Sequence, residues 1–223
     1  MTVKIQIAAS ILNADLGALR EAVQRAEAAG VDRIHLDIMD GSFVPNITFG
    51  LATVASLRSA TTLPFDAHLM VAEPSYWAAR FAAAGCETVA IHVEAPEAHA
   101  ATLQAIRSAG AEAGLAIDPG TPASALEPYV AQLDFGLVMS VKSGFGGQLY
   151  QPEAAARCGE LRKLLGPAAP IHLDGGVKVQ VAGDAARAGA TVLIAGTALF
   201  GAPSMEEAVR ELRATAAAAL GGS

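Results

Sequence analysis

Three short segments that pair histidine with aspartate are the clearest candidates for chemistry in this sequence. They are His35-Leu36-Asp37-Ile38-Met39-Asp40-Gly41, Asp66-Ala67-His68-Leu69-Met70 and His172-Leu173-Asp174-Gly175-Gly176. Alternate residues of a β-strand point to the same face, so each segment places an imidazole and a carboxylate on one side of a strand. Such groups are costly to bury without partners, and three of these segments at strand ends therefore indicate a functional site.

The residue types favour a divalent metal ion. Two imidazoles and two carboxylates suit an ion of borderline softness, with zinc as the favoured ion and iron, manganese or cobalt as alternatives. We expect one such ion per chain. A purely structural cluster of hydrogen-bonded side chains is the competing interpretation, and the metal content of the protein distinguishes the two.

Three glycine-containing segments indicate a site for a phosphorylated ligand. Gly144-Phe145-Gly146-Gly147-Gln148 follows the expected sixth strand, Gly175-Gly176 the seventh and Gly196-Thr197 the eighth. Glycines leave backbone N–H groups accessible, and the loops after strands seven and eight form the usual phosphate site of a (β/α)8 barrel. Each segment taken alone is equally consistent with a tight turn.

Short apolar runs alternate with amphipathic helical stretches, which predicts an α/β fold with a parallel sheet. Eight such units in 223 residues average about 28 residues each, close to one βα repeat. The count favours a closed (β/α)8 TIM barrel over an open doubly wound sheet. We expect one domain covering residues 1–223. The expected strands are Lys4–Ala9, Arg33–Ile38, Phe65–Met70, Thr88–His92, Glu112–Ile117, Phe135–Ser140, Ala169–Leu173 and Val192–Ala195.

Helix signals fill the intervals between these strands. The first helix shows a 3.6-residue period, and the last opens with Ser204 and Glu207 at capping-box spacing. A glycine after each of four helices predicts a helix-to-strand turn. The final residues, 221–223, should fray. The first helical stripe is Leu16, Leu19, Val23 and Ala26, the last is Met205, Val209 and Leu212, and the four glycines are Gly30, Gly85, Gly110 and Gly189.

The composition limits the compartment and the kinds of partner. The chain is 52% hydrophobic, but it has no apolar run near the roughly 18 to 20 residues of a membrane span, and its N-terminus does not resemble a signal peptide. We therefore expect a cytoplasmic protein without membrane contact. The 15 Lys and Arg residues are scattered and the net charge is −7, which argues against nucleic acid as a partner. We expect a homo-oligomer that binds a small molecule.

Several residues outside these segments have predicted structural roles. Cys86 and Cys158 lack the number and spacing of a disulfide framework or a zinc knuckle, so we expect inert, buried thiols. His92 and Glu94 end the expected fourth strand and are candidate partners of the metal ligands. On the helix that follows, His99 should be solvated.

Together these segments resemble the ribulose-phosphate 3-epimerase family. The resemblance extends from Ser10-Ile11-Leu12 to Gly196-Thr197 and is strongest in His35 to Asn46, Asp66 to Val71, Gly144 to Gln148 and Asp174 to Gly176. It implies a barrel of the ribulose-phosphate-binding type that acts as a metal-dependent 3-epimerase. The implied reaction is epimerisation at C3 of a ketose phosphate, with conversion of D-ribulose 5-phosphate to D-xylulose 5-phosphate favoured, by two-base proton transfer through a metal-stabilised enediolate.

The resemblance also implies roles for individual residues. Asp37 and Asp174 would transfer the protons, because inversion needs one carboxylate on each side of a planar intermediate. The same two carboxylates would bind the metal ion together with His35 and His68. The implied substrate contacts are Ser10, His68 and Asp174, with Gly144, Phe145, Gly146, Gly147, Gly175, Gly176, Gly196 and Thr197 around the phosphate and Met39, Met70 and Met139 around the reacting carbons.

Some residues depart from the pattern of the family. Ala9 stands where Pro is usual, Asn13 replaces a usual Ser, Asp118 replaces an Asn, and Val141-Lys142-Ser143 replaces a Val-Asn-Pro-like sequence. Lys142 adds a cation beside the expected phosphate loop, so it bears on substrate identity rather than on reaction type.

Two alternative functions stay open. A D-allulose-6-phosphate 3-epimerase would reuse every proposed reacting group, and a non-catalytic phosphate-sugar binding barrel would keep the fold without turnover. Phosphate-binding decarboxylases of similar fold carry an Asp-x-Lys-x-x-Asp run, and here Ile38 follows Asp37 without such a lysine. The sequence therefore argues against decarboxylation.

Overall fold

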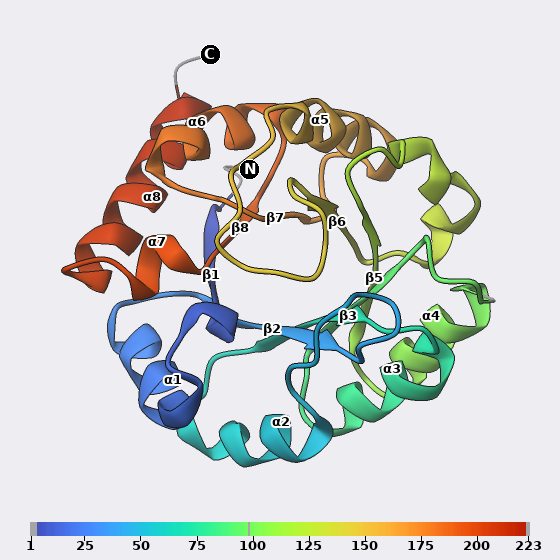
Figure 1. Ribbon diagram of the computed structural model, residues 1–223. Coiled ribbons are helices and arrows are strands. Elements are labelled where there is room, and N and C mark those ends of the chain that lie inside the picture. Colours follow the sequence, from blue (N-terminus) through green and yellow to red (C-terminus); the bar gives the residue numbers. More distant parts are fainter. Residues whose placement is uncertain (1–3, 98, 222–223) are drawn as a thin grey trace.

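A computed structural model describes residues 4–97 and 99–221, and its eight strands form a closed parallel barrel in sequential order. Figure 1 looks into this barrel, with the helices forming an outer ring. The predicted (β/α)8 barrel is therefore confirmed. The strands are β1 (Gln6–Ser10), β2 (Arg33–Met39), β3 (Phe65–Met70), β4 (Thr88–His92), β5 (Glu112–Ile117), β6 (Phe135–Met139), β7 (Ile171–Asp174) and β8 (Val192–Ala195).

Helices connect consecutive strands. The α-helices are α1 (Leu19–Ala28), α2 (Leu51–Leu57), α3 (Pro74–Ala83), α4 (His99–Ser108), α5 (Glu153–Leu165), α6 (Val179–Ala188), α7 (Thr197–Phe200) and α8 (Met205–Gly221). The 3-10 helices are η1 (Ile11–Asn13), η2 (Leu16–Ala18), η3 (Arg58–Ala60) and η4 (Ala123–Gln132). A 3-10 helix, not an α-helix, joins β5 to β6, and it contains Pro128, which has no N–H to donate to an α-helical hydrogen bond.

The sequence located the strands well. The predicted bounds of β3, β4, β5 and β8 agree with the structure. The bounds of β2 and β6 differ by one residue at the C-terminal end, and those of β1 and β7 differ by one or two residues at both ends. The predicted turn glycines are also confirmed, because Gly30, Gly85, Gly110 and Gly189 all have positive φ angles.

The first helical stripe was partly wrong. Leu16 lies in η2 and is 58% exposed, because the α-helix begins only at Leu19, whereas Val23 and Ala26 are buried as predicted. In the last helix the predicted cap forms, since the Glu207 N–H donates to Ser204 Oγ at 3.3 Å. The buried stripe of that helix, Met205, Val209 and Leu212, is confirmed.

Two apolar layers stabilise the barrel. The larger lies between strands and helices and includes Ile34, Leu36 and Ile38 of β2 packed with Val23 and Val54 from the outer ring. A smaller cluster takes the alternate strand positions and therefore fills the barrel interior. Its members are Ala8, Ala90, Ala116, Phe135, Leu137, Met139, Val192 and Ile194.

Other side chains outside the barrel interior were predicted with mixed success. Cys86 and Cys158 are free and buried as expected, and burial raises the pKa of both thiols to about 12. The prediction for His99 was wrong, because only 6% of this residue is exposed. Its Nε2 lies 2.9 Å from the carbonyl oxygen of Val93, and its ring makes an edge contact with Tyr129. A backbone acceptor and an aromatic neighbour thus offset part of the cost of burial, while Nδ1 has no hydrogen-bond partner among the described residues.

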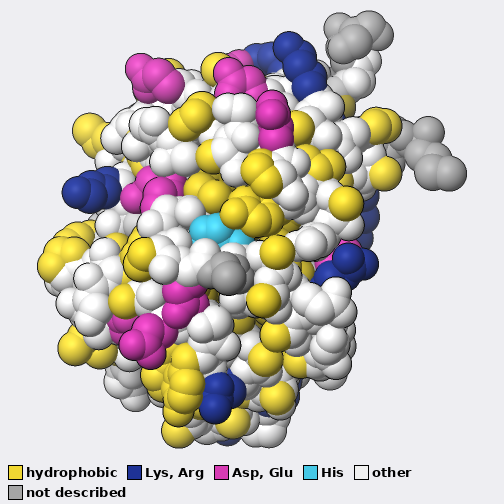
Figure 2. Space-filling model, turned by 90° about the vertical axis from the view of Figure 1, so that its right-hand side faces the viewer, with side chains coloured by type: hydrophobic (Ala, Val, Ile, Leu, Met, Phe, Trp, Pro, Cys, Tyr) yellow, Lys and Arg dark blue, Asp and Glu magenta, His cyan; other side chains and the backbone are white. Residues whose placement is uncertain are grey.

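The surface, the helix lengths and the C-terminal end were also compared with the predictions. Figure 2 shows one side of the molecule, where acidic, basic and hydrophobic side chains are interspersed. In the described ranges, 4–97 and 99–221, no helix is both long and apolar enough to cross a bilayer. Residues 221–223 were predicted to fray. Gly221 is the last residue of α8, and residues 222–223 lie outside the described residues.

A close contact inside the barrel generates a stability prediction. Gly114 in β5 faces the ring of Phe135, and an added Cβ would lie 2.4 Å from Phe135 Cζ. We expect Gly114→Ala to lower the free energy of unfolding by about 1–3 kcal/mol through overpacking. Each kcal/mol should lower Tm by about 2–4 °C, which thermal unfolding followed by circular dichroism measures.

The matched control is Gly159→Ala within α5. The nearest atom to its added Cβ is the carbonyl oxygen of Ala188 at 3.4 Å, an ordinary contact distance. Because alanine favours a helix over glycine, this variant should match or exceed the parent in Tm. An unchanged Tm for Gly114→Ala would contradict the packing of this layer.

Candidate metal and phosphate site

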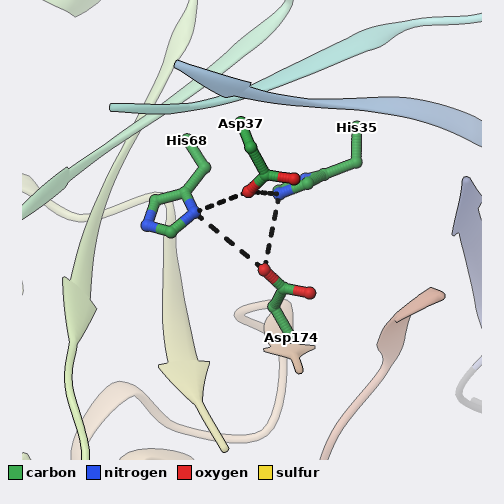
Figure 3. A group of neighbouring side chains, drawn as sticks. All are labelled: His35, Asp37, His68 and Asp174. Atoms are coloured by element: carbon green, nitrogen blue, oxygen red, sulfur yellow. Dashed lines mark hydrogen bonds and ion pairs between the residues drawn. The ribbon is translucent and has the colours of Figure 1, made fainter. Parts of the chain in front are cut away.

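The register of the strands brings four predicted metal ligands together. Pairing of β2 with β3 sets His35 beside Asp66 and Asp37 beside His68, and barrel closure adds Asp174 from β7. One ligand atom from each of His35, Asp37, His68 and Asp174 lies within 4.8 Å of the others. Figure 3 shows these four side chains pointing toward one another. The convergence expected from the three His/Asp segments is therefore present.

These atoms lie close to the spacing that one ion requires. Asp37 Oδ1 lies 3.4 Å from His35 Nε2 and 3.2 Å from His68 Nδ1. Asp174 Oδ2 lies 3.8 Å from that His35 nitrogen and 4.0 Å from that His68 nitrogen. Ligands about 2.0–2.2 Å from a tetrahedral ion are roughly 3.3–3.6 Å apart. His35 Nε2 is buried and has no hydrogen-bond partner, so the residues present fit a divalent ion.

A buried carboxylate orients His35 from below. Asp66, which is 1% exposed, has Oδ2 at 3.0 Å from His35 Nδ1, and its Oδ1 accepts a hydrogen bond of 2.7 Å from Thr88 Oγ1. His172 Nδ1 lies 3.2 Å from the same Oδ2 atom, and the His172 ring stacks on Phe135. A proton on His35 Nδ1 leaves Nε2 free to face the other ligands.

A second chain of contacts orients His68. Its Nε2 lies 2.7 Å from His92 Nε2, and His92 Nδ1 lies 3.0 Å from Glu94 Oε2. If His68 presents Nδ1 to an ion, its Nε2 carries the proton and donates to His92. His92 then carries its own proton on Nδ1 and donates it to Glu94. The prediction that His92 and Glu94 are partners of the ligands agrees with these contacts.

The environment gives the two carboxylates of the cluster different pKa values. Burial opposes ionisation of Asp37, but His35 and His68 outweigh it and hold the Asp37 pKa well below its usual range. Burial raises the pKa of Asp174 to about 7, with a further contribution from the negative charge of Asp37. Burial lowers the pKa of His68 to about 4. A divalent cation would displace the protons that these groups hold.

A pocket opens above the cluster and collects the predicted substrate residues. All of them line it except His68, which lies beneath with no exposed surface. In Figure 1 the loop after β6 lies in front of the barrel centre. The predicted residues in the lining are Ser10, Asp37, Met39, Met70, Met139, Gly144, Phe145, Gly146, Gly147, Asp174, Gly175, Gly176, Gly196 and Thr197.

Hydrogen bonds hold the glycine loop over this pocket. Asn46 Nδ2 donates to the carbonyl oxygen of Gly144 at 2.9 Å. Gln148 Nε2 donates to the carbonyl oxygens of Lys142 and Phe145 at 2.7 and 2.8 Å. The Lys142 side chain is exposed at the pocket rim. The loop thus has its backbone fixed by side-chain amides.

Sequence reasoning missed three contributors to the site. Asp66 belongs to a His/Asp segment that we identified, but its partner His35 lies on another strand and only the register reveals it. Asp118 and Ser143 depart from the family pattern and bond to each other, with Ser143 Oγ donating to Asp118 Oδ1 at 2.6 Å. Their joint departure was the signal that could have revealed this contact.

Comparisons with known proteins point to one enzyme family. The sequence model of the Ribulose-phosphate 3 epimerase family matches residues 6–200. A ribulose-phosphate 3-epimerase of Mycobacterium tuberculosis is 42% identical over 219 residues, which cover 96% of this chain and 93% of the relative. One of Bacillus subtilis is 39% identical over 214 residues, 94% of this chain and 98% of the relative. A chloroplastic ribulose-5-phosphate-3-epimerase of Arabidopsis thaliana is 42% identical over 217 residues, which cover 95% of this chain and 77% of the relative.

Solved structures with lower sequence identity share the fold. A 3-hexulose-6-phosphate synthase matches with a TM-score of 0.70 at 23% identity, over 95% of this chain and 99% of that one. An orotidine 5'-phosphate decarboxylase from Pyrococcus horikoshii matches with a TM-score of 0.68 at 19% identity, over 94% of this chain and 98% of that one. At these identities the likeness concerns the barrel alone.

The contact between Asp66 and His35 generates a prediction about metal affinity. Asp66→Asn should weaken zinc binding about 10- to 100-fold, because the amide cannot hold His35 Nδ1–H as a carboxylate does. Competition with a chromophoric chelator measures this affinity. Thr88→Val removes only the hydroxyl that bonds Asp66 and should give a smaller loss in the same direction.

The control for charge is Glu112→Gln, at an exposed position at the start of β5. It removes one negative charge without touching the cluster and should leave zinc affinity unchanged. Equal zinc affinity in the parent and Asp66→Asn would show that Asp66 does not orient His35.

Proposed function

Because the chain belongs to the ribulose-phosphate 3-epimerase family, we propose that it interconverts D-ribulose 5-phosphate and D-xylulose 5-phosphate by proton transfer at C3. The observation that carries the proposal is the pair Asp37 and Asp174, which face each other within a buried His/Asp cluster below a glycine-lined pocket. This combination suits an acid–base reaction on a phosphorylated sugar.

The two carboxylates are proposed to act from opposite sides of the substrate. Asp37 lies near the end of β2 and Asp174 ends β7, so they approach the pocket from different parts of the barrel. One removes the C3 proton of one epimer, and the other returns a proton to the opposite face of the planar enediolate. In the reverse direction the two residues exchange these roles. When bound, a divalent ion supplies positive charge that stabilises the developing negative charge on the substrate oxygens.

Hydrogen bonds prepare each carboxylate for this role. Ser10 Oγ donates to Asp37 Oδ2 at 2.7 Å, and the N–H of Gly175 donates to Asp174 Oδ1 at 2.7 Å. Each bond fixes one oxygen and leaves the other, Asp37 Oδ1 or Asp174 Oδ2, within the cluster. The side chains therefore have one orientation toward both the ion and the substrate.

The rest of the pocket suits the two ends of the substrate. Met39, Met70 and Met139 are 4%, 1% and 3% exposed and line the pocket beside the carboxylates. Their thioethers exclude water without competing for protons. At the other end, Gly144 to Gly147, Gly175, Gly176, Gly196 and Thr197 offer backbone N–H groups to a phosphate.

Three finer properties belong to the same proposal. Zinc is the ion we favour for His35, Asp37, His68 and Asp174, because two imidazoles and two carboxylates match its preferences. We also propose a homo-oligomer, whose interface would cover Ile47 and Leu149, which are 76% and 83% exposed. We propose a cytoplasmic location.

A coupled assay tests the substrate and the reaction together. The protein should epimerise D-ribulose 5-phosphate with a higher kcat/KM than D-allulose 6-phosphate, and in deuterated water the product should carry deuterium at C3. Asp174→Asn should lower kcat at least about 10²- to 10⁴-fold in both directions, because one proton-transfer group is lost. Preference for the hexulose phosphate would assign the chain to the allulose reaction.

The control is Asp184→Asn, an exposed carboxylate on α6, which should keep the parent kcat. Near-normal epimerisation by Asp174→Asn would contradict the two-base scheme, and turnover of neither sugar by the parent would indicate a binding protein.

A further inference from the structure

Asn13, one of the departures from the family pattern, lies against the glycines of the phosphate end. It closes η1 directly after β1 and contributes to the pocket lining. A Cβ added to Gly146 would lie 2.5 Å from Asn13 Nδ2, and a Cβ added to Gly196 would lie 2.1 Å from Asn13 Oδ1. The carboxamide therefore sits between the loop after β6 and the loop after β8.

This carboxamide has unused hydrogen-bonding capacity. Within the described part of the chain, neither Asn13 Nδ2 nor Oδ1 has a hydrogen-bond partner. The neighbouring amides differ, since Asn46 Nδ2 and Gln148 Nε2 each donate to loop carbonyls. Asn13 is half-buried and faces the pocket instead of the surrounding backbone. An amide with two free N–H donors in this position can bind an anion.

The surroundings of Asn13 need such a donor. The residues lining this end of the pocket are mainly glycines, and Lys142, which is exposed, is the one Lys or Arg among the lining residues that the structure describes. A phosphate dianion only accepts hydrogen bonds, and donors to charged groups contribute more than donors to neutral ones. A serine at this position would offer a single, shorter donor, whereas the asparagine amide reaches the gap between Gly146 and Gly196.

We propose that Asn13 is a ligand of the substrate phosphate, with Nδ2–H donating to a phosphate oxygen held by the two glycine loops on either side of it. This inference rests on the proposed function only in that the substrate carries a phosphate. Asn13 is separate from the proton transfer in its role, since it has no hydrogen bond to Asp37 or Asp174 in the described structure. It therefore determines affinity for the phosphate end and not the rate of the chemical step.

Two variants of similar volume test the donor. Asn13→Asp keeps the shape but turns a carboxylate toward the phosphate, and it should raise KM for D-ribulose 5-phosphate about 100-fold or more. Asn13→Leu keeps the bulk without any donor and should raise KM about 10-fold, equivalent to one lost hydrogen bond to a charged group. In both, kcat should stay within about threefold of the parent, because a change in KM alone marks lost uniform binding.

A turnover-independent probe separates this inference from the proposed function. Inorganic phosphate should raise Tm of the parent and raise it less in both variants, because a ligand stabilises the state that binds it. If the parent lacks epimerase activity but this pattern holds, the proposed function fails and the role of Asn13 stands. If the parent is active but neither KM nor the phosphate effect changes in the variants, Asn13 is not a ligand.

Two further variants show whether the effect is specific to the Asn13 carboxamide. Asp15 lies in the same segment between β1 and α1 and is exposed, and its side chain accepts a hydrogen bond from the N–H of Gly17. The KM of Asp15→Asn should therefore equal that of the parent. Asn13→Ser restores the residue usual in the family and folds even if Asn13→Leu does not. A KM several-fold above the parent for Asn13→Ser supports the proposal. A lower KM for Asn13→Ser would overturn it, because the amide would then obstruct the phosphate.

Discussion

The burial of three carboxylates among histidines inside the barrel is the interaction on which the site depends. Asp37, Asp66 and Asp174 all lie within the strand layer, and an unpaired carboxylate there would cost far more than one hydrogen bond contributes. Asp66 is satisfied by His35 and Thr88. Asp37 and Asp174 instead share a space with the unpartnered Nε2 of His35. A cation at that point would contact both carboxylates and the free imidazole nitrogen at once.

The parallel barrel makes this arrangement possible. The register between β2 and β3 pairs His35 with Asp66 and Asp37 with His68, so one strand pair supplies three of the proposed ligands and the carboxylate that orients one of them. Closure of the sheet brings Asp174 from β7 opposite them. The loops that follow the same strand ends carry the glycines of the pocket. The proposed reacting groups and the proposed phosphate site thus lie within one opening, which is the usual organisation of barrel enzymes.

The sequence predicted what depends on local pattern and missed what depends on register. Short apolar runs predict the strands, so β3, β4, β5 and β8 were placed to the residue. Glycines predict the turns, because glycine readily adopts the positive φ that these turns have. The four ligands followed from alternation along strands and from the family resemblance. Burial of His99 and the contact of Asp66 with His35 arise from contacts between separate elements. No single-segment pattern contains that information, and the same holds for Asn13 beside Gly196.

The central claim is that the buried cluster of His35, Asp37, His68 and Asp174 is a metal centre and not a structural hydrogen-bond network. Elemental analysis of the purified, active protein tests it most directly. The account predicts close to one divalent ion per chain, loss of both ion and epimerase activity on chelation, and recovery when zinc is returned. Protein that retains full epimerase activity after its metal content has fallen to a small fraction of one ion per chain would contradict the account.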